Sequence, residues 1–597
     1  MAKREVEKEH KKLDKETAKK WFHKFIDYLR HFVIIFMVFF MLNMAMKYLN
    51  GVEDFNPFDF SRYNAYYWST FIIWFALYLI FKGITGRTKL SLLIILALEY
   101  IFDMINATVI NVRGAAISIS DVGAIPTAAS VARTIEFPWT TSITIATCAV
   151  IIAILIIIVF RNQLLSLKGG VKVRILKVVI GVGAFIVLAS TSVYKDDSLW
   201  NLNERYYDSG TPITILRLLQ NYKVEAPKGY DKDKVKDLLA KYETSGNTDS
   251  TTDVPNIIVI ANESFSDYYN TYNTGYDDPI PFYNSLAKQE GTISGITYSS
   301  TFGGETANVE FEFFTQNSLK VLPIGAFPFQ QYISRDVKGS LPNVLRNQGY
   351  TTFAYHPWLT YAYSRNKVYK YLGFDEAYYL EQIGMENLEE NFNSEYPSDS
   401  SLYRYIIDKM EDKPSNQKIF EYILTMQNHI SYRFPSEEMQ TYHEDLDRNV
   451  YMQLLHASDD ALKEFVEYLE KQDEKYILMI FGDHQPRLGI LDNTDGKQYE
   501  VPFLIWANYQ LPTQHNIVTS TVYLQNYLIE AAGLKPTAMN NYMKELSKEI
   551  PVLTKNFFMD KDYKYYDNSI EKQSRFTKLD EYDRICYYRI FDENKEK

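Results

Sequence analysis

The chain has 597 residues, a net charge of −11 at neutral pH and two cysteines, Cys148 and Cys586. This length allows more than one domain, and hydrophobic segments crowd the first third while the remainder is rich in Tyr, Asp, Glu and Asn. There is no basic recognition patch, so a nucleic-acid partner is not expected. Two cysteines exclude a disulfide framework and a Cys-based zinc site. This low cysteine content suits a Gram-positive cell-surface protein.

Five apolar segments follow a mostly basic N-terminus, residues 1–30, that has a helical pattern. The segments are Phe32–Tyr48, Ala65–Phe81, Leu90–Ile110, Thr140–Phe160 and Ile175–Tyr194. Each is close to the ~20 residues that cross a bilayer as a helix. A cleaved signal peptide is the alternative for the first segment, but no small-residue cleavage site follows it and more spans come after it. We therefore expect residues 31–194 to form the five transmembrane helices of a multi-pass cell-membrane protein.

The short loops indicate how these helices are oriented. The N-terminus, the Lys82–Lys89 turn and the Arg161–Arg174 loop are rich in Lys and Arg, whereas the Asn50–Asn64 loop has one arginine against three acidic residues. The positive-inside rule then places the N-terminus in the cytoplasm. With five spans, everything after Tyr194 is expected to be extracellular.

Two polar features belong to the membrane portion. Glu99 and Asp103 lie one helical turn apart in the third span, where charge is costly and usually faces the bundle interior or a water-filled cavity. A structural hydrogen-bond network and a lipid-handling role are both open for this pair. Residues 113–137 are too polar to span, and we expect an interfacial helix on the outer surface near lipid headgroups.

Residues 195–254 are polar and are expected to form an extracellular linker with short helices. Thr211–Gln220 and Asp231–Tyr242 have the pattern of short amphipathic helices, and Thr244–Asp253 has too little apolar content to pack. We expect a globular domain over residues 255–540. An aromatic and charged C-terminal extension, residues 541–597, is expected to dock on it.

The globular domain alternates apolar runs with helical patterns. The expected strands are Asn256–Ala261, Gly291–Tyr298, Thr351–Tyr355, Lys418–Thr425, Tyr476–Phe481 and Val501–Trp506. The expected helices are Pro281–Gln289, one that starts at Thr306, Leu341–Asn347, one near Arg365, Ser401–Met410, Tyr442–Lys471 and Ser520–Ala532. Such alternation predicts an α/β fold with a mainly parallel sheet covered by helices on both faces.

Candidate metal ligands follow two of the expected strands. Glu263 comes after the run Asn256–Ala261, and Asp483 and His484 come after Tyr476–Phe481. Buried parallel strands of this kind place their last residues in the crevice at the carboxyl edge of the sheet, where open α/β folds bind ligands. The three side chains are ordinary ligands for a divalent metal, so they are expected to converge on one ion.

A Gly-Gly turn offers a hydroxyl to the same crevice. In the stretch Ser299–Phe314, Gly303 and Gly304 allow a sharp turn just before Thr306, which starts a helix whose free N–H groups favour an anion. The ordinary alternative is a helix N-terminus in which Thr306 is only a cap. Bound to a divalent metal, the threonine oxygen ionises far more readily than in water, which makes Thr306 a candidate nucleophile.

Two histidines can enter this crevice as well. His356 and His429 each follow an expected strand, although a lone histidine in such a place is more often a satisfied hydrogen-bonding residue than a catalyst. The acidic residues around Thr306 are expected to shape its helix rather than bind metal; they are Glu305, Glu310 and Glu312.

These residues resemble the motifs of the lipoteichoic acid synthase group of membrane phosphoglycerol transferases, within the alkaline phosphatase and sulfatase superfamily. The matching pieces stand in the family's order and are Asn262-Glu-Ser-Phe-Ser-Asp267, Gly303-Gly-Glu-Thr-Ala-Asn-Val-Glu-Phe-Glu312, His356 with Arg365, Asn428-His429 and Gly482-Asp-His484. The resemblance covers most of residues 255–540, and the membrane portion before it has the family's layout. It implies a sulfatase-like catalytic domain.

The resemblance also implies roles around a bound phosphate. His356, Arg365 and His429 would surround it, with Arg365 as the bidentate clamp that phosphate geometry favours. Trp358 or Tyr363 would form an aromatic wall for glycerol. His429 is the expected acid that protonates the departing alcohol, and His356 is the alternative.

The resemblance suggests Mn²⁺ as the cofactor, with Mg²⁺ as the alternative. Superfamily members with two metals need a further Asp-x-x-x-His arrangement, and residues 255–540 contain none. One ion is therefore expected, with Glu263, Thr306, Asp483 and His484 as its ligands.

The expected activity is transfer of glycerol phosphate from phosphatidylglycerol through a covalent intermediate on Thr306, at the outer face of the membrane bilayer. The acceptor would be a growing polyglycerol phosphate chain on a glycolipid, or a surface polysaccharide that receives single glycerol phosphates. We expect Tyr355–Tyr363 and Ser431–Phe434 to line the acceptor groove, where aromatic rings can stack against a sugar or glycerol chain; ordinary surface packing of these tyrosines is the alternative. Phosphoethanolamine transfer uses the same fold. A sulfatase of the usual kind is not expected, because the Cys/Ser-x-Pro-x-Arg context is missing after Thr306. A catalytically inactive receptor or scaffold would lack a metal ligand, and none is missing.

Overall fold

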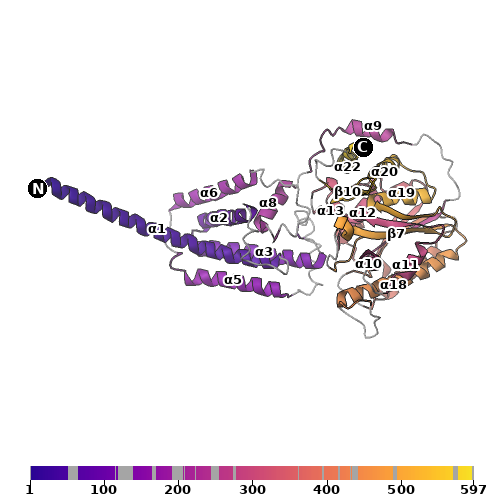
Figure 1. Cartoon of the computed structure of the whole chain (residues 1–597), viewed down its shortest axis with the longest axis horizontal. Coiled ribbons are helices and arrows are strands. Elements are labelled where there is room, and N and C mark those ends of the chain that lie inside the picture. Colours follow the sequence, from indigo (N-terminus) through magenta and orange to yellow (C-terminus); the bar gives the residue numbers. More distant parts are fainter. Residues whose placement is uncertain are drawn as a thin grey trace. The chain divides into compact units, whose positions relative to one another are not determined.

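The structure is a computed structural model of the chain. It describes residues 2–50, 65–113, 116–117, 139–164, 170–190, 206–207, 209–221, 224–243, 254–272, 277–323, 325–360, 362–392, 396–414, 417–429, 432, 442–488, 494–568 and 576–593. Two compact units can be distinguished (Figure 1). The first comprises Met1–Ile119 and Ile135–Lys223, and the second comprises Ser120–Thr134 and Val224–Lys597.

The first unit contains five helices that are long and apolar enough to cross a membrane, which confirms that part of the fold predicted from the sequence. They are α1 (Ala2–Leu49), α2 (Ala65–Thr85), α3 (Thr88–Arg113), α5 (Thr141–Val159) and α6 (Val171–Ser190). The shorter helix α8 (Thr211–Asn221) belongs to the same unit. The basic N-terminus and the first apolar segment form one helix, α1, which packs against α5 and α3, while α2 packs against α6.

Asp103 lies at the centre of a hydrogen-bond network inside this unit. Its side chain is 1% exposed, and its Oδ1 accepts from Asn50 Nδ2 at 3.2 Å and from the Thr211 hydroxyl. Asn50 Oδ1 accepts in turn from Asn106 Nδ2 at 2.7 Å. These bonds account for a buried polar group in an apolar helix, and a lipid-handling role of Glu99 and Asp103 stays a prediction.

Several sequence predictions fall mostly outside the described residues. They concern the Asn50–Asn64 loop, the interfacial segment 113–137 and the linker Thr244–Asp253.

The second unit is built on an eight-stranded sheet with the order β4-β3-β5-β1-β6-β7-β2-β8. The strands are β1 (Asn256–Asn262), β2 (Ile293–Tyr298), β3 (Thr351–His356), β4 (Glu376–Tyr379), β5 (Ile419–Leu424), β6 (Tyr476–Gly482), β7 (Glu500–Ala507) and β8 (Gln514–Ser520). All neighbours pair in parallel except β7, which is antiparallel to both β6 and β2. The mainly parallel α/β sheet predicted from the sequence is confirmed.

Helices cover both faces of this sheet, as Figure 1 shows around β7. Alternate residues of β1 explain why: Ile257 and Val259 pack on one face, and Ile258 and Ile260 on the other. On the first face lie α12 (Thr306–Thr315), α14 (Leu341–Arg346), α15 (Arg365–Leu372) and α19 (Thr521–Ala531). On the second lie α11 (Pro281–Leu286), α17 (Asp399–Glu411) and α18 (Leu446–Glu470). The shorter helices of this region are α10 (Tyr268–Tyr272), α13 (Pro328–Gln331) and α16 (Leu380–Ile383).

Two local predictions from the sequence were wrong in detail. The long helix α18 begins at Leu446 rather than Tyr442, because the Asp445 carboxylate accepts a hydrogen bond from the Arg448 N–H at 3.0 Å and caps the helix there. The two edge strands, β4 and β8, were not predicted, because their sequences Glu-Ala-Tyr-Tyr and Gln-His-Asn-Ile-Val-Thr-Ser have no long continuous apolar run. A strand at the edge of a sheet has fewer neighbours to pack against, so it needs none.

The C-terminal part of the unit packs against α19. It contains α20 (Ala538–Ser547), β9 (Val552–Leu553), β10 (Phe557–Met559), β11 (Tyr565–Asp567) and α22 (Thr577–Tyr587), and α9 (Lys232–Ala240) joins it. Val522 and Tyr523 of α19 share a core with Tyr542, Tyr582 and Cys586, all of them fully buried. Residue 540, the expected end of the catalytic domain, lies inside α20.

Candidate active site

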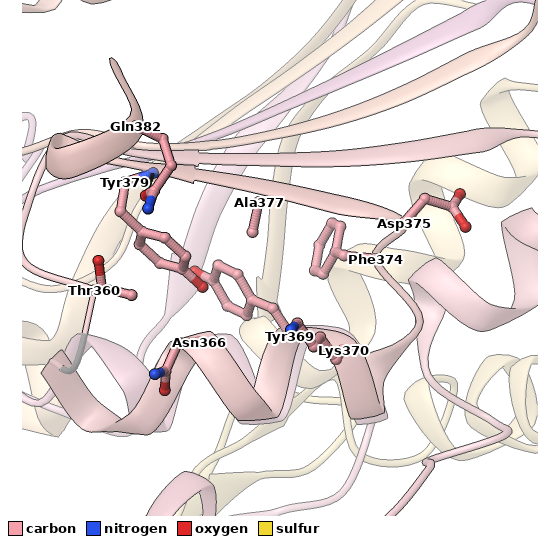
Figure 2. A pocket seen from close by; sticks show the side chains of 9 residues that line it. All are labelled: Thr360, Asn366, Tyr369, Lys370, Phe374, Asp375, Ala377, Tyr379 and Gln382. Carbon is pink, nitrogen blue, oxygen red and sulfur yellow. Dashed lines mark hydrogen bonds between the residues drawn. The ribbon is translucent and has the colours of Figure 1, made fainter. Parts of the chain in front are cut away.

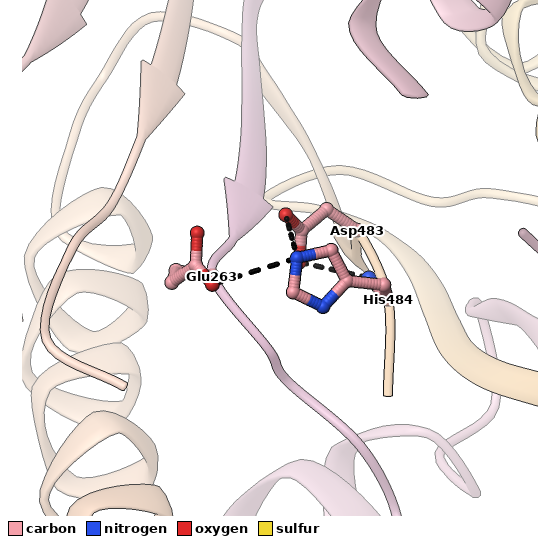
Figure 3. Close-up of side chains that lie close together, drawn as sticks. All are labelled: Glu263, Asp483 and His484. Atoms are coloured by element: carbon pink, nitrogen blue, oxygen red, sulfur yellow. Dashed lines mark hydrogen bonds and ion pairs between the residues drawn. The ribbon is translucent and has the colours of Figure 1, made fainter. Parts of the chain in front are cut away.

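Three side chains converge where the neighbouring parallel strands β1 and β6 end. Asn262 pairs in register with Gly482, so Glu263 and Asp483 leave the sheet side by side. A Cβ on Gly482 would lie 1.9 Å from the Phe265 carbonyl oxygen, which requires glycine there. Figure 3 shows the His484 ring between the two carboxylates, with Nε2 at 3.2 Å from Asp483 Oδ2 and 3.6 Å from Glu263 Oε1.

Hydrogen bonds from neighbouring residues orient this trio. Ser264 donates its N–H to Asp483 Oδ1 at 2.8 Å and its hydroxyl to Glu263 Oε1 at 2.9 Å. Thr425, just after β5, accepts from the Glu263 N–H at 3.0 Å. Sequence reasoning assigned no role to Ser264 or Thr425, although Ser264 stands inside the Asn-Glu-Ser motif. These bonds hold the carboxylates in place.

Thr306 lies beside the trio. Its hydroxyl donates to Glu263 Oε2 at 3.3 Å, and it is the first residue of α12. The N-cap position belongs to Glu305, whose φ of 66° is left-handed and which makes no side-chain cap bond. Gly303, with φ of 65°, completes the turn. The threonine hydroxyl is therefore directed at the acidic cluster rather than at its own helix.

This cluster fits a divalent cation. Ligand atoms of Glu263, Asp483 and His484 all lie within 4.8 Å of one another, and all three residues are buried. Asp483 Oδ2 and His484 Nε2 lie 3.2 Å apart, and neither atom makes a hydrogen bond with a described residue. Burial and the Glu263 carboxylate raise the pKa of Asp483 to about 7, while His484 lowers it, so a cation between the two carboxylates would stabilise the ionised form of Asp483. Carboxylate, hydroxyl and imidazole donors suit a single Mn²⁺ or Mg²⁺ ion.

Arg365 forms a second buried cluster around α12. Its Nε and Nη2 donate to Glu310 Oε2 at 2.9 and 2.6 Å, and both side chains are almost fully buried. Tyr369 donates its hydroxyl to the other Glu310 oxygen. Glu310 stands one helical turn after Thr306, so the pair ties α15 to the helix of the candidate nucleophile. Among the described residues the metal-type cluster comprises Glu263, Asp483 and His484, and a helix-shaping role for Glu310 stays a prediction.

His356 is enclosed next to Arg365. Its Nε2 lies 3.4 Å from Arg365 Nη1, and its Nδ1 lies 3.3 Å from the Leu424 carbonyl oxygen. Burial and the guanidinium lower the pKa of His356 well below its usual value. Because both ring nitrogens are engaged, we assign the Nδ1–H tautomer, with Nε2 facing Arg365.

The aromatic residues expected near the phosphate divide between two groups. The Arg365 guanidinium lies over the Tyr363 ring, with Cζ 5.1 Å from the ring centre. Trp358 contacts Tyr396 with ring centres 5.1 Å apart, and Tyr396 contacts the His429 ring at 4.9 Å. Tyr396 was missed by sequence reasoning, since it stands far from every motif. His429 is close enough to His356 to lower the pKa of His356 further.

A cavity of about 210 Å³ lies between α15 and β4. Figure 2 shows Tyr369 and Tyr379 pointing toward each other across it, and Phe374 lies beside them. From the segment Tyr355–Tyr363, which was expected to line an acceptor groove, only Thr360 lines this cavity. Of the second expected lining segment, Ser431–Phe434, the structure describes only Tyr432. Neither Arg365 nor Thr306 is part of the lining of this cavity.

Comparisons with known proteins agree with this architecture. Residues 255–534 match the family model described as Sulfatase. A putative cyclic beta-1,2-glucan modification protein of Rhizobium meliloti is 28% identical over 400 residues, covering 61% of this chain and 59% of that protein. Lipoteichoic acid synthase 1 of Bacillus subtilis is 22% identical over 375 residues, covering 59% of this chain and 56% of that protein. The chain thus spans between half and two thirds of the length of both relatives.

The solved structure of the Streptococcus pyogenes phosphoglycerol transferase GacH, in complex with sn-glycerol-1-phosphate, shares the fold. It superimposes with a TM-score of 0.50 at 20% sequence identity, covering 62% of this chain and 96% of that one. The family model and this shared fold agree that residues 255–534 form a domain similar to the family described as Sulfatase.

Proposed function

We propose that this chain is a membrane-anchored phosphoglycerol transferase that moves glycerol phosphate from phosphatidylglycerol to an acceptor hydroxyl through a covalent intermediate on Thr306. The observation that carries the proposal is the Thr306 hydroxyl, 3.3 Å from Glu263 and beside Asp483 and His484 at the ends of two parallel strands. The relative named as a lipoteichoic acid synthase and the structure named as a phosphoglycerol transferase support glycerol phosphate as the transferred group.

Glu263, Thr306, Asp483 and His484 would hold one divalent ion, Mn²⁺ by preference, and such an ion would lower the pKa of the threonine hydroxyl and offset phosphate charge. Thr306 Oγ1 forms the new bond to phosphorus as the bond from phosphorus to the diacylglycerol oxygen breaks. An acceptor oxygen then attacks the same phosphorus and Thr306 leaves. Each departing oxygen takes up one proton, and each attacking oxygen loses one.

His429 is our choice for the residue that moves these protons. His356 has both ring nitrogens engaged, with Leu424 and Arg365, and its lowered pKa keeps it neutral. It therefore positions Arg365. Arg365 donates to Glu310 from Nε and Nη2. Its Nη1 carries two N–H groups; one faces His356 Nε2, and we propose that the other donates to a phosphate oxygen. Tyr363 under the guanidinium and Trp358 beside Tyr396 are the proposed walls for the glycerol group.

The acceptor defines two versions of this function. We propose polyglycerol phosphate synthesis on a glycolipid anchor, as in the relatives named lipoteichoic acid synthases. The relative named as a glucan modification protein, at 28% identity, favours a second version in which single glycerol phosphates are added to a surface polysaccharide.

A reconstitution experiment tests the function and separates its versions. Full-length protein in liposomes receives phosphatidylglycerol, Mn²⁺ and either a glycolipid primer or a glucan, and products are sized on a gel. A ladder on the primer supports polymerisation. Diacylglycerol release that requires the glucan, without a ladder, contradicts polymerisation and supports the second version. Release of ethanolamine phosphate from phosphatidylethanolamine, with none of glycerol phosphate, would refute both.

A further inference from the structure

A lysine from the C-terminal part of the second unit reaches the turn that carries Thr306. Lys555 Nζ lies 3.3 Å from Glu305 Oε2, and the two side chains are 25% and 12% exposed. Lys555 stands between β9 and β10, beyond residues 255–534, the range matched by the family model. The domain therefore receives a positive charge at its candidate nucleophile from outside the shared family region.

The position of Lys555 is closely determined. Its own N–H donates to Ser300 Oγ at 3.0 Å, so Lys555 contacts the nucleophile turn at both ends, Ser300 and Glu305. The preceding residue, Thr554, accepts the Phe557 N–H at 3.0 Å on its hydroxyl. Phe557 packs edge-on against Tyr298 with ring centres 5.6 Å apart. The turn that presents Lys555 is thus anchored on β2, the strand that leads to the nucleophile.

Without Lys555, the Glu305 carboxylate would add an uncompensated negative charge beside Thr306. This carboxylate also accepts from Asn308 Nδ2 at 3.0 Å, which keeps it at the start of α12 immediately before Thr306. It is close enough to act electrostatically on His484. Together with Glu263 and Asp483 it makes three carboxylates around Thr306, one more than a divalent ion neutralises. A phosphodiester donor is itself an anion, so an unpaired Glu305 would repel it.

We propose that Lys555 is a positioning residue that neutralises Glu305 and so admits an anionic phosphodiester beside Thr306. The proposal rests on the proposed phosphoryl-transfer function for its substrate. It assigns to the C-terminal part a role in substrate binding as well as in packing.

This role has a signature that a purely structural ion pair lacks. Removing the lysine charge weakens binding of an anion but strengthens binding of a cation at the neighbouring site, because the local field becomes more negative. Loss of structure would instead weaken both. The two affinities therefore have to change in opposite directions.

The experiment uses full-length Lys555→Gln, Glu305→Gln and the double variant in detergent micelles. Mn²⁺ affinity is measured by calorimetry, and KM is measured for phosphatidylglycerol and for a chromogenic phosphodiester. We expect Lys555→Gln to raise KM about 3- to 10-fold while Mn²⁺ binds as tightly as before or about 3-fold more tightly. Glu305→Gln should weaken Mn²⁺ binding without raising KM. The double variant should return both values to within about 2-fold of the wild type, as expected for two coupled charges.

Lys320→Gln is the matched control. Lys320 forms a similarly enclosed ion pair with Asp583, at 2.6 Å, so its loss should lower the melting temperature but leave KM and Mn²⁺ affinity unchanged. Lys555→Arg, which keeps the charge, should restore most of the donor affinity.

Weaker binding of both Mn²⁺ and donor in Lys555→Gln, or an unchanged KM, would overturn the proposal. Diacylglycerol release by the wild type tests the proposed function independently of the role of Lys555. If the wild type releases no diacylglycerol from phosphatidylglycerol, the Mn²⁺ measurements and the chromogenic diester still decide the role of Lys555.

Discussion

Burial decides the charge of single carboxyl groups in this sheet, and Glu421 on β5 is the plainest case outside the site. Its side chain is 2% exposed, and the nearest hydroxyl, that of Tyr355, lies 3.4 Å from Oε1. Oε2 makes no hydrogen bond within the described residues. Burial raises the pKa of Glu421 to about 8 from a usual value of 4.5. The native state therefore keeps a proton that the unfolded chain loses.

This difference predicts how stability depends on pH. Between pH 4.5 and about 8 the native state binds more protons at Glu421 than the unfolded state, so its contribution to the free energy of unfolding falls as pH rises through that window. Glu421→Gln removes the titration. The variant should match the wild type in melting temperature near pH 4.5 and exceed it by roughly 2–6 °C at pH 8. Thermal unfolding followed by circular dichroism measures this. A constant difference between the two proteins at all pH values would contradict a raised pKa.

At the scale of elements, the site depends on two strand ends and one helix start. β1 and β6 are fully buried, and their pairing brings Glu263 next to Asp483 and His484. The helix α12 adds Thr306, and the Arg365–Glu310 pair one turn later holds that helix against α15. Glu263 and Asp483 directly follow the last residues of their strands, so the pairing of β1 with β6 fixes where both carboxylates start.

Metal removal should therefore act on both folding and activity. An ion that binds only the native state adds about 2.7 kcal/mol at a hundred times its Kd. Chelation of full-length protein should lower the melting temperature by roughly 3–8 °C and abolish diacylglycerol release, and Mn²⁺ should restore both better than Mg²⁺. Asp483→Asn serves as the control, because its melting temperature should no longer respond to chelator. Two metals per chain in elemental analysis would contradict the single-ion site.

The sequence predicts an element when a local run of residues determines it, and does not when contacts between distant residues do. Ile257–Ala261 and Tyr476–Phe481 are continuous apolar runs, so strands β1 and β6 were predicted directly, each one residue shorter than observed. The strand β8 and the partner residue Tyr396 depend on neighbours distant in the chain, and no local pattern marks them. The Lys555–Glu305 pair spans 250 residues and depends on how the C-terminal part packs, which periodicity does not encode.

The second unit is expected to lie on the opposite side of the membrane from the Lys82–Lys89 turn. This orientation is a prediction from the basic loops and from the five candidate spans among the described residues. Single cysteines placed in that turn and at Ser245, in a Cys148→Ala background, test it with a membrane-impermeant maleimide. In intact cells the cysteine at 245 should be labelled, and the cysteine in the turn should react only after permeabilisation.

Cys586 needs no replacement in this assay, because it is fully buried and burial raises the pKa of its thiol to about 12. Labelling of the turn in intact cells, with position 245 protected, would reverse the orientation and place the candidate site in the cytoplasm.

In the proposed mechanism, Thr306 carries the glycerophosphoryl group during turnover. The most direct measurement is mass spectrometry of full-length protein after a short incubation with Mn²⁺ and phosphatidylglycerol, quenched in acid and digested. We predict a glycerophosphate adduct on the peptide that contains Thr306, lost when acceptor is added before the quench. Thr306→Ala should fold normally, carry no adduct and show no turnover, whereas Thr306→Ser should retain a measurable adduct. Turnover by well-folded Thr306→Ala, or an adduct on another residue, would contradict the account.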